Sequence, residues 1–391
     1  MEPNMSANPR RWDIFCNVVD NYGDIGVTWR LARQLVEEFG LRVCLWVDDL
    51  ASFARICPQL RLDQARQQCQ GVDIAHWDAH FSTSWQPGDL VIEAFACELP
   101  ELAKQRMTQC QPAPLWLNLE YLSAESWIDE CHGLPSLQLN GLQKYFYFPG
   151  FTLRSGGVIC EHSLADQRQQ WQQNPEARQQ LFSSFGLPQQ AEQTRYLSLF
   201  TYESTALPAL LTHWRDSDTP ICCLIPQGRI LNSVASWLDH PLETMTPGYY
   251  WQQGSLTILI LPMTDQAGYD HLLWSCDFNW VRGEDSFLRA QWAARPFLWH
   301  IYPQADEAHL EKLTAFLRLY GHNLSADCYN ALISLSVAYD RGEGNAAVSA
   351  WQTLEQYTTE LQAHAQSWPQ QALAGGDLAS RLVQFSEKRL K

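Results

Sequence analysis

The sequence shows no membrane-spanning or secretory segment along its 391 residues. Its longest apolar run, around Leu256–Met263, is much shorter than the roughly 20 residues that a membrane-spanning helix needs. The N-terminal residues Met1–Ser6 lack the basic and apolar parts of a secretory signal. Charged residues make up only 18% of the chain and form no long blocks of one sign, which argues against a disordered tail. We therefore expect a cytoplasmic protein that does not bind a membrane.

Basic residues are scarce, with 27 Lys and Arg against 43 Asp and Glu and a net charge of −16. This balance disfavours nucleic-acid binding, because nucleic acids are held by basic patches. The 12 Cys include no CxxC pair and no Cys/His cluster with zinc-like spacing. Several stand in apolar runs, as Cys16 and Cys44 do, where a reduced thiol behaves as a small hydrophobe. We expect buried free thiols in a reducing compartment and no bound metal.

Motifs of three common enzyme classes are missing. None of the 11 His stands with a Ser or Cys nucleophile in a recognisable triad context, which disfavours hydrolases of that kind. The sequence contains neither a Walker A motif nor an aspartate-rich metal motif beside a strand. The chemistry is therefore expected to need no resident cofactor.

The chain does contain enough apolar material for two domains. Hydrophobic residues make up 46% and aromatic residues 12%, and 391 residues exceed what one ordinary core serves. In the first third, a strand expected at Trp12–Val19 precedes a helical pattern at Val27–Phe39, which Gly40 ends. Alternation of this kind builds a parallel sheet with helices on both faces. The other strands expected here are Arg42–Val47, Val72–Ala75, Asp89–Phe95 and Leu115–Leu119.

A second strand–helix series follows the polar tract Ala165–Gln193, which we interpret as a surface helix and connector. The expected class is α/β, with Rossmann-like, doubly wound domains at residues 1–180 and 190–369. A C-terminal helix within residues 370–391 is expected to pack back on the first domain. Two such domains bind ligands in the cleft between them, at the carboxyl ends of their strands. The expected elements are strands Tyr196–Phe200, Ile221–Ile225, Leu256–Leu261, Phe278–Val281 and Pro296–Ile301, and helices Asp270–Trp274, Phe287–Trp292, Glu307–Tyr320, Val348–Gln362 and Leu378–Leu390.

The first candidate site is the segment Asn17–Gly26, called the acidic loop below. It places Asp20 and Asp24 at a turn from a strand to a helix. Its glycines do not form a GxGxxG motif, and its acids would repel a pyrophosphate. The loop therefore suits a cationic or hydroxylic acceptor and general-base chemistry. A structural alternative stays open, in which Asp24 caps the helix and Asp20 stabilises the turn.

The second candidate is Arg282–Ser286, called the arginine turn below. It follows an apolar strand and opens the next helix through a glycine turn. Backbone N–H groups at that helix start, with Ser286 beside them, would hold a diphosphate. Glu284 and Asp285 suit the hydroxyls of a ribose or another sugar. Two alternatives stay open: an ordinary helix with an acidic first turn, and an Arg282 that pairs with Glu284 instead of facing the leaving phosphate.

Weaker candidates follow other strands. Phe200 and Tyr202 follow the first strand of the second domain, where their rings could stack on a base or sugar. Gln266 and Tyr269 flank another loop of that domain, and Glu120–Tyr121 follows a first-domain strand where it could contact an acceptor. Each of these residues taken alone is more often structural.

Four segments together resemble a known family. They are Asp20–Gly26 of the acidic loop, Asn118–Glu125, Phe200–Glu203 and Tyr269–Trp292, and the similarity spans the chain from about Trp12 to beyond His300. They are similar to the protein-arginine rhamnosyltransferases that modify translation elongation factor P. The Arg-Gly-Glu-Asp-Ser-Phe motif is the most specific part. The resemblance implies a GT-B fold, inverting transfer of L-rhamnose from dTDP-β-L-rhamnose, and an arginine side chain as acceptor.

The resemblance also implies roles for individual residues. Asp20 is the expected general base, Asp24 the second essential acid, and Glu284 a further catalytic residue. The expected partners are elongation factor P and dTDP-rhamnose, and nothing in the sequence requires more than a monomer. The nucleotide-sugar site that the resemblance implies is Phe200, Tyr202, Gln266, Arg282, Glu284, Asp285 and Ser286. We further expect Asn17, Gly23 and Tyr269 to contact dTDP-rhamnose, and Asp20, Asn21, Asp24, Glu120 and Tyr121 to contact the acceptor.

The chemistry of both candidate segments agrees with this reaction. A guanidinium, with a pKa above ~12, is a poor nucleophile that a carboxylate must orient and deprotonate as the C–N bond forms. Ser286, the N–H groups after Gly283 and Arg282 can stabilise a leaving dTDP without metal. Two other functions stay open. One is a GT-B transferase with another sugar nucleotide or a small-molecule acceptor, and the other is a non-catalytic module that binds a nucleotide or a translation factor.

Overall fold

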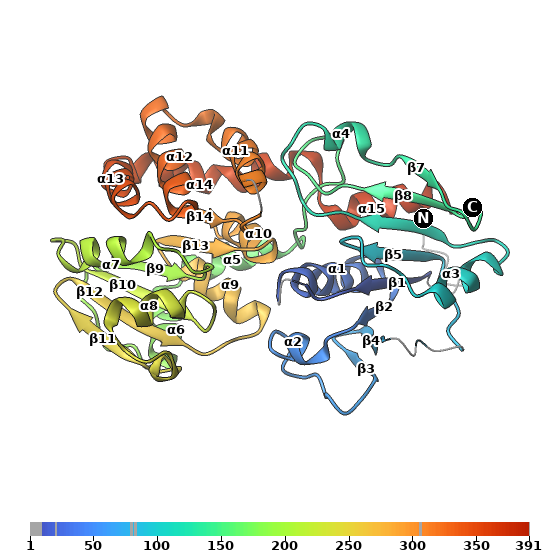
Figure 1. Cartoon of the computed structure of the whole chain (residues 1–391), viewed down its shortest axis with the longest axis horizontal. Helices are drawn as coiled ribbons and strands as arrows, with labels where there is room; N and C mark the ends of the chain where they lie inside the picture. Colours follow the sequence, from blue (N-terminus) through green and yellow to red (C-terminus); the bar gives the residue numbers. More distant parts are fainter. Residues whose placement is uncertain (1–9, 20–21, 79–80, 82–83, 305–306, 391) are drawn as a thin grey trace. The chain divides into compact units, whose positions relative to one another are not determined.

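The computed structural model divides into two compact units, and each is described by itself (Figure 1). The structure describes residues 10–19, 22–78, 81, 84–304 and 307–390. Unit 1 comprises residues 1–162 and 372–391, and unit 2 comprises residues 163–371. The sequence analysis placed this boundary near residue 180; the helices that follow residue 163 instead pack within unit 2. The C-terminal segment returns to unit 1.

Unit 1 is built on an eight-stranded sheet with the order β3-β4-β2-β1-β5-β6-β8-β7. The pairs between β4 and β8 are parallel, and β3 and β7 add antiparallel strands at the two edges. Asp13 is buried in the central strand β1, where it accepts bonds from the N–H of Gly88 (2.7 Å) and the indole of Trp46 (2.9 Å). The strands are β1 (Arg11–Cys16), β2 (Arg42–Val47), β3 (Arg66–Cys69), β4 (Val72–His76), β5 (Leu90–Ala94), β6 (Leu115–Leu119), β7 (Pro135–Leu137) and β8 (Gln143–Tyr147), and the helices are α1 (Gly23–Phe39), α2 (Leu50–Ala54), α3 (Glu101–Thr108), α4 (Ile128–Cys131) and α15 (Leu378–Glu387).

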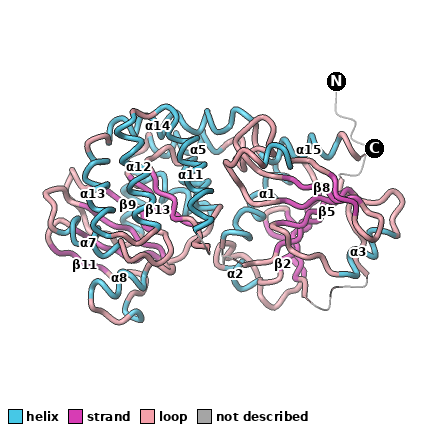
Figure 2. Tube along the Cα trace, turned by 45° about the horizontal axis from the view of Figure 1, so that its top comes forward, coloured by secondary structure: helices cyan, strands magenta, loops and turns pink. Residues whose placement is uncertain are grey.

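Unit 2 is built on a six-stranded sheet with the order β11-β12-β10-β9-β13-β14, parallel except for β11. Its helices surround the strands (Figure 2). The central strands are apolar and almost fully buried, as expected for a sheet covered on both faces. The strands are β9 (Arg195–Leu199), β10 (Ile221–Pro226), β11 (Tyr250–Gln253), β12 (Leu256–Leu261), β13 (Phe278–Arg282) and β14 (Phe297–His300), and the helices are α5 (Leu164–Gln172), α6 (Pro175–Ser184), α7 (Leu207–Arg215), α8 (Leu231–Leu238), α9 (Gln266–Ser275), α10 (Asp285–Trp292), α11 (Ala308–Tyr320), α12 (Ala326–Asp340), α13 (Gly344–Glu355) and α14 (Thr358–Ala372).

Several elements differ from those expected. The tract interpreted as a connector contains two helices, α5 and α6, and the indole of Trp171 donates to Ser275 (3.0 Å) in helix α9 of the same unit. Helix α12 was not predicted, and the single helix expected at Val348–Gln362 is two helices, α13 and α14. Strand β1 ends at Cys16 rather than at Val19, because the following backbone N–H groups bond to side chains instead of the sheet.

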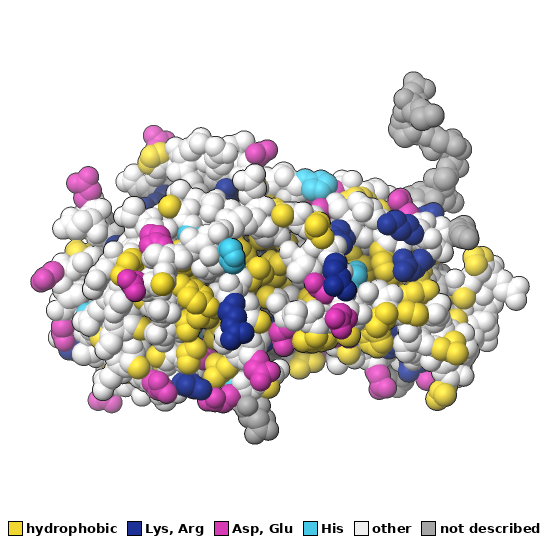
Figure 3. All heavy atoms as spheres, turned by 90° about the horizontal axis from the view of Figure 1, so that it is seen from above, with side chains coloured by type: hydrophobic (Ala, Val, Ile, Leu, Met, Phe, Trp, Pro, Cys, Tyr) yellow, Lys and Arg dark blue, Asp and Glu magenta, His cyan; other side chains and the backbone are white. Residues whose placement is uncertain are grey.

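Parallel strands bring the loops that follow them to one edge of each sheet. In unit 1 these loops follow β1, β5 and β6, and in unit 2 they follow β9, β12, β13 and β14. None of the helices in the described residues is long and apolar enough to span a bilayer. On the face drawn in Figure 3, Lys and Arg side chains are interspersed with Asp and Glu.

Candidate functional site

The acidic loop in unit 1 is held by Asp24, the second residue of helix α1. Its carboxylate accepts the N–H of Val19 (2.9 Å) and the hydroxyl of Tyr121 (3.0 Å). Helix α1 begins at Gly23, with Tyr22 at the N-cap position, so Asp24 lies inside the helix and is not the N-cap considered from the sequence. Asp24 is 2% exposed and instead ties the loop after β1 to the loop after β6.

A second carboxylate holds the same loop from strand β2. Asp48, which directly follows β2, accepts the N–H of Val18 (2.8 Å). Two consecutive backbone N–H groups, those of Val18 and Val19, are therefore bound by acids from different elements. Asp20 and Asn21 lie outside the described residues, and they immediately follow this anchored backbone.

Glu120 and Tyr121 lie beside the acidic loop, at the end of strand β6. The Tyr121 ring, 42% exposed, stacks on Phe95 with 4.5 Å between ring centroids. The side chain of Asn118 donates to Glu120. Burial raises the pKa of Glu120, and the bond from Asn118 opposes that shift. Unit 1 therefore brings together Asp24, Glu120 and Tyr121 as a set of acceptors suited to a cationic group.

The two other predicted residues of this loop, Asn17 and Gly23, lie on either side of the anchored backbone. Asn17 follows β1 and is exposed, and Gly23 is the first residue of helix α1. Both belong to unit 1, whereas the other residues predicted to contact dTDP-rhamnose belong to unit 2.

The arginine turn in unit 2 begins with a guanidinium that lies between two aromatic rings. The Cζ atom of Arg282 is 4.9 Å from the ring centroid of Phe200 and 4.8 Å from that of Tyr202. Arg282 is 4% exposed, and within the described residues its Nη1 has no hydrogen-bond partner and the side chain makes no ion pair. The pairing with Glu284 considered from the sequence is thus not formed. Aromatic rings hold this cation in place without neutralising it.

The backbone after Arg282 forms a left-handed turn into helix α10. Gly283 has φ +61°, which glycine adopts without strain, and its carbonyl accepts the indole N–H of Trp299 (2.9 Å). Glu284 precedes the helix and makes no side-chain cap. Asp285 and Ser286 form the first turn, each 9% exposed. The amides of an uncapped helix start and the positive end of the helix favour an anion.

Further predicted residues gather around Phe200. The Tyr269 ring contacts Phe200 edge-on at 5.6 Å between centroids. Burial raises the pKa of Tyr269, and Ser286 beside its hydroxyl acts in the opposite direction. Gln266 is the first residue of helix α9 and is 5% exposed. Unit 2 therefore unites Phe200, Tyr202, Gln266, Tyr269 and the arginine turn at the carboxyl edge of its sheet.

A buried ion pair joins the two helices of this site. Arg289 of helix α10 donates to both carboxylate oxygens of Asp270 in helix α9, at 2.8 and 2.7 Å. The side chains are 2% and 7% exposed. A bidentate pair of this kind fixes geometry as well as charge, so α9 and α10 present their first turns together.

The family described as Elongation-Factor P (EF-P) rhamnosyltransferase EarP matches residues 12–387. This chain belongs to that family. The protein-arginine rhamnosyltransferase of Shewanella oneidensis is 52% identical over 391 residues, which cover 98% of this chain and 99% of the relative. The protein-arginine rhamnosyltransferase of Pseudomonas aeruginosa is 50% identical, and the match covers 96% of this chain and 98% of the relative. One from Neisseria meningitidis is 37% identical, and the match covers 97% of each chain. The predicted family and the enzyme class, a glycosyltransferase, are confirmed.

Solved structures agree with this assignment. One that describes EarP-mediated arginine glycosylation of translation elongation factor EF-P has a TM-score of 0.67 and 36% identity, and covers 97% of this chain and 99% of its own. A glycosyltransferase from Rickettsia africae (TM-score 0.54, 10% identity, 98% and 100% covered) shares the fold. A UDP-GlcNAc 2-epimerase from Neisseria meningitidis also shares the fold, with a TM-score of 0.56 and 9% identity, and the match covers 97% of this chain and 100% of the epimerase. The predicted GT-B fold, with two Rossmann-like halves, is confirmed.

Further residues of this EarP-family chain, which the sequence motifs do not indicate, surround Tyr202. His300 and Tyr302 each contact the Tyr202 ring edge-on, at 5.4 Å between centroids, and the Arg229 guanidinium lies 5.6 Å from that ring. Burial lowers the pKa of His300 to about 3, helped by nearby His309 and Arg282. Their signal was their position: His300 ends strand β14 and Tyr302 lies in the loop after it, close to the end of the predicted strand Pro296–Ile301, where ligand-binding residues of this fold lie.

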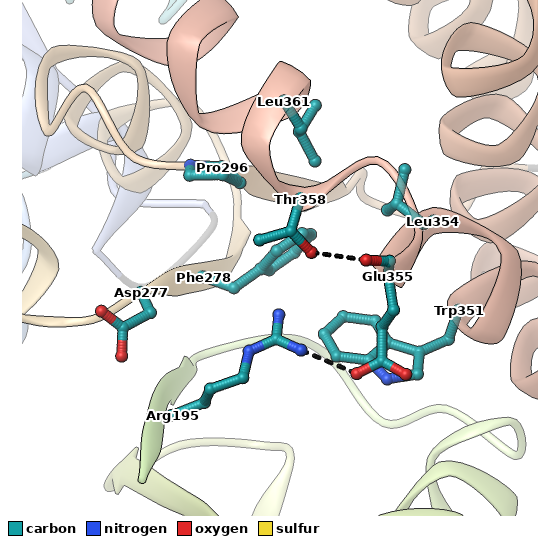
Figure 4. Close-up of a pocket in the computed structure, with 9 residues that line it drawn as sticks. All are labelled: Arg195, Asp277, Phe278, Pro296, Trp351, Leu354, Glu355, Thr358 and Leu361. Atoms are coloured by element: carbon teal, nitrogen blue, oxygen red, sulfur yellow. Dashed lines mark hydrogen bonds and ion pairs between the residues drawn. The ribbon is translucent and has the colours of Figure 1, made fainter. Parts of the chain in front are cut away.

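A pocket in unit 2 lies away from these residues, at the opposite ends of the same strands (Figure 4). Arg195 begins β9 and donates to Glu355 (2.7 Å) inside the pocket. Its guanidinium also lies 5.4 Å from the ring centroid of Trp351. The charges of Arg195 and Glu355 are already paired with each other, and the arginine turn lies at the other edge of the sheet. The described part of the chain holds no cluster of three His, Cys, Asp or Glu arranged to hold a metal ion.

Proposed function

We propose that this enzyme transfers L-rhamnose, with inversion, from dTDP-β-L-rhamnose to an arginine side chain of translation elongation factor P. The observation that carries the proposal is the nearly full-length similarity to protein-arginine rhamnosyltransferases, at 52% and 50% identity. The geometry supports it from two sides. Unit 1 places the acids Asp24 and Glu120 beside the acidic loop, and unit 2 presents the Arg282 guanidinium, which makes no ion pair within the described residues, at a helix start without a side-chain cap, which suits a diphosphate.

On the acceptor side, Asp20 is the proposed general base. It orients the arginine guanidinium and takes a proton as a guanidino nitrogen attacks the anomeric carbon. Asp24 holds the Val19 N–H next to Asp20, so its proposed role is to position the base as well as to add negative charge. Asn21, Glu120 and Tyr121 complete the proposed acceptor contacts.

On the nucleotide-sugar side, the dTDP leaving group departs with the electron pair of the broken C–O bond. Arg282, Ser286 and the amides after Gly283 stabilise the charge that develops on the diphosphate. Glu284 and Asp285 are proposed to bind sugar hydroxyls, with Glu284 aligning the anomeric carbon. The proposed contacts further include the rings of Phe200, Tyr202 and Tyr269, the amide of Gln266, and Asn17 and Gly23 from the acidic loop.

The proposed setting is that of a monomeric, cytoplasmic enzyme that works without a metal cofactor. The alternatives are a transferase for another sugar nucleotide or a small acceptor, and a module that binds without catalysis. The first alternative forms a different product, and the second forms none.

The test is to incubate the purified protein with dTDP-rhamnose and elongation factor P and to measure the intact mass of the factor. One added deoxyhexose on an arginine supports the proposal. No mass change, or a change only with another sugar nucleotide, would overturn it. An Asp20→Ala variant that binds dTDP and does not transfer excludes the binding-module alternative, whereas normal transfer by this variant would remove Asp20 as the base.

A further inference from the structure

The carboxyl end of helix α12 holds buried polar residues that the proposed mechanism does not use. The hydroxyl of Tyr339 shares a hydrogen bond with Thr201 Oγ1 (2.9 Å), and the Tyr339 carbonyl accepts the hydroxyl of Ser204 (2.9 Å). These two bonds flank Tyr202, whose ring lies against the guanidinium of Arg282. The end of α12 therefore fixes the segment that follows β9.

The last residue of the same helix, Asp340, reaches the loop that follows β14. The backbone N–H of Gln304 donates to Nδ1 of His309 (3.1 Å), so a neutral His309 carries its proton on Nε2. That Nε2 lies 3.6 Å from Oδ1 of Asp340, whose side chain is 0% exposed. Within the described residues, neither carboxyl oxygen of Asp340 makes a hydrogen bond of good geometry, although the Ile301 N–H approaches the group.

Asp340 is a buried acid. Burial raises the pKa of Asp340 to about 8, against the smaller opposite effect of the Ile301 N–H, so its carboxyl group is protonated at neutral pH. An unsatisfied buried acid costs stability, and such groups concentrate at functional sites. Titratable and charged groups also lie on the elements around Asp340. They are His309 on α11, Glu307 just before α11, Tyr339 on α12, Arg341 just after α12, and His300 at the end of β14.

Both loops held by the end of α12 meet at Tyr202. Tyr302 belongs to the loop that His309 binds at Gln304, and its ring contacts Tyr202 edge-on at 5.4 Å between centroids. We propose that Asp340 and His309 are positioning residues, which hold Tyr302 against Tyr202 and so set the Arg282 guanidinium for the diphosphate of the nucleotide sugar. This inference rests on the proposed function of the arginine turn.

The neutral form of Asp340 is the competent form. When the carboxyl group ionises, it attracts the Nε2–H of His309 and draws that ring, with the bound Gln304 backbone, away from the arrangement that supports Tyr302. Nucleotide affinity therefore falls as the pH rises through about 8. Asparagine at this position keeps the shape of the neutral acid and does not ionise.

The test measures the dissociation constant of dTDP by tryptophan fluorescence between pH 6 and 9.5, together with donor KM and kcat. The wild type is expected to lose affinity above pH 8, and Asp340→Asn to keep its affinity over the whole range. Asp340→Ala is expected to raise the dissociation constant and KM about three- to tenfold at pH 7, with kcat at saturating donor unchanged. The matched control is Glu307→Gln, which breaks the exposed pair with Arg341 (2.8 Å) beside the same loop and leaves dTDP affinity unchanged.

The outcomes separate the inference from the proposed function. If the wild type binds dTDP and modifies the acceptor but shows the same pH profile as Asp340→Asn, the inference is overturned alone. An Asp340→Ala variant with a lowered melting temperature and unchanged dTDP affinity overturns it too. Should that variant fail to fold, the profile of Asp340→Asn decides. A wild type that binds no dTDP overturns the proposed function, and the inference with it.

Discussion

At the scale of single residues, Asp24 combines two tasks that the sequence could not separate. Its carboxylate carries negative charge into a site proposed for a cation, and it also anchors the backbone next to Asp20 through the Val19 N–H. The hydrogen bond from Tyr121 shows that the same group joins two loops. Substitutions at Asp24 can therefore separate the effect of its hydrogen bonds from the effect of its negative charge.

Asp24→Ala is expected to lower kcat about 10²-fold, because losing the anchor displaces the neighbouring base. Asp24→Asn can still accept the Val19 N–H and donate to the Tyr121 oxygen, so we expect a smaller fall. Steady-state kinetics with elongation factor P measures both, and Tyr121→Phe is the control that removes the hydrogen bond from Tyr121 to Asp24 and keeps the carboxylate. Equal inactivity of the Asn and Ala variants would show that charge, and not positioning, is the main role of Asp24.

At the scale of elements, the start of helix α10 depends on the backbone of Gly283. Gly283→Ala places a side chain at φ +61°, and we expect a loss of stability of about 1–2 kcal/mol together with weaker dTDP binding. The control is Gly248→Ala, at φ +88° with no heavy atom within 4 Å of the added carbon. Thermal melts and dTDP titration distinguish the two: both variants lose stability, and only Gly283→Ala loses affinity. Unaltered affinity in that variant would argue against a diphosphate at this turn.

The end of helix α12 makes stability depend on pH. The pKa of Asp340 is about 8 in the folded protein, and an aspartate in an unfolded chain has a pKa of about 3.9. The folded state thus binds more protons between these values, so Asp340 destabilises the fold least below pH 4, and its cost grows as the pH rises to about 8. Asp340→Asn is expected to raise the melting temperature at pH 8.5 and to have little effect at pH 4. The opposite trend would contradict a protonated Asp340.

Some elements of the structure could be predicted from the sequence, and others could not. Strands β2, β6 and β12 were predicted with their observed bounds, because each is a short apolar run between polar segments. Helix α12 was missed, since its apolar residues cover too much of its surface to give a clear helical stripe. The arginine turn could be found from its motif. The contacts of the Arg282 guanidinium with aromatic rings and the role of Asp340 could not be found in this way, because they depend on residues far apart in the sequence.

At the scale of the whole molecule, the net charge of −16 does not select an arginine acceptor by itself. Long-range attraction is screened over about 8 Å at physiological ionic strength, so local carboxylates must do this work. The chain also crosses between its units twice, near residues 162 and 372. The second crossing returns residues 372–391 to unit 1, where Asp377 and helix α15 pack with helix α1. The unit that carries the acidic loop is thus completed by the last residues described.

A substitution of Arg381 tests whether the C-terminal segment stabilises unit 1. Its guanidinium donates to the carbonyls of Thr152 (3.2 Å), Leu153 (2.6 Å) and Gly375 (2.7 Å), which joins the C-terminal segment to unit 1. Arg381→Ala is expected to destabilise unit 1 by about 1–3 kcal/mol, since hydrogen bonds from a charged group are lost. Calorimetry with and without dTDP is the measurement. The ligand stabilises only the unit that binds it, so the transition lowered by Arg381→Ala should be the one that dTDP does not raise. If a single transition moved with both the substitution and dTDP, the two units would unfold as one, and the acceptor and nucleotide sites would share a common stability.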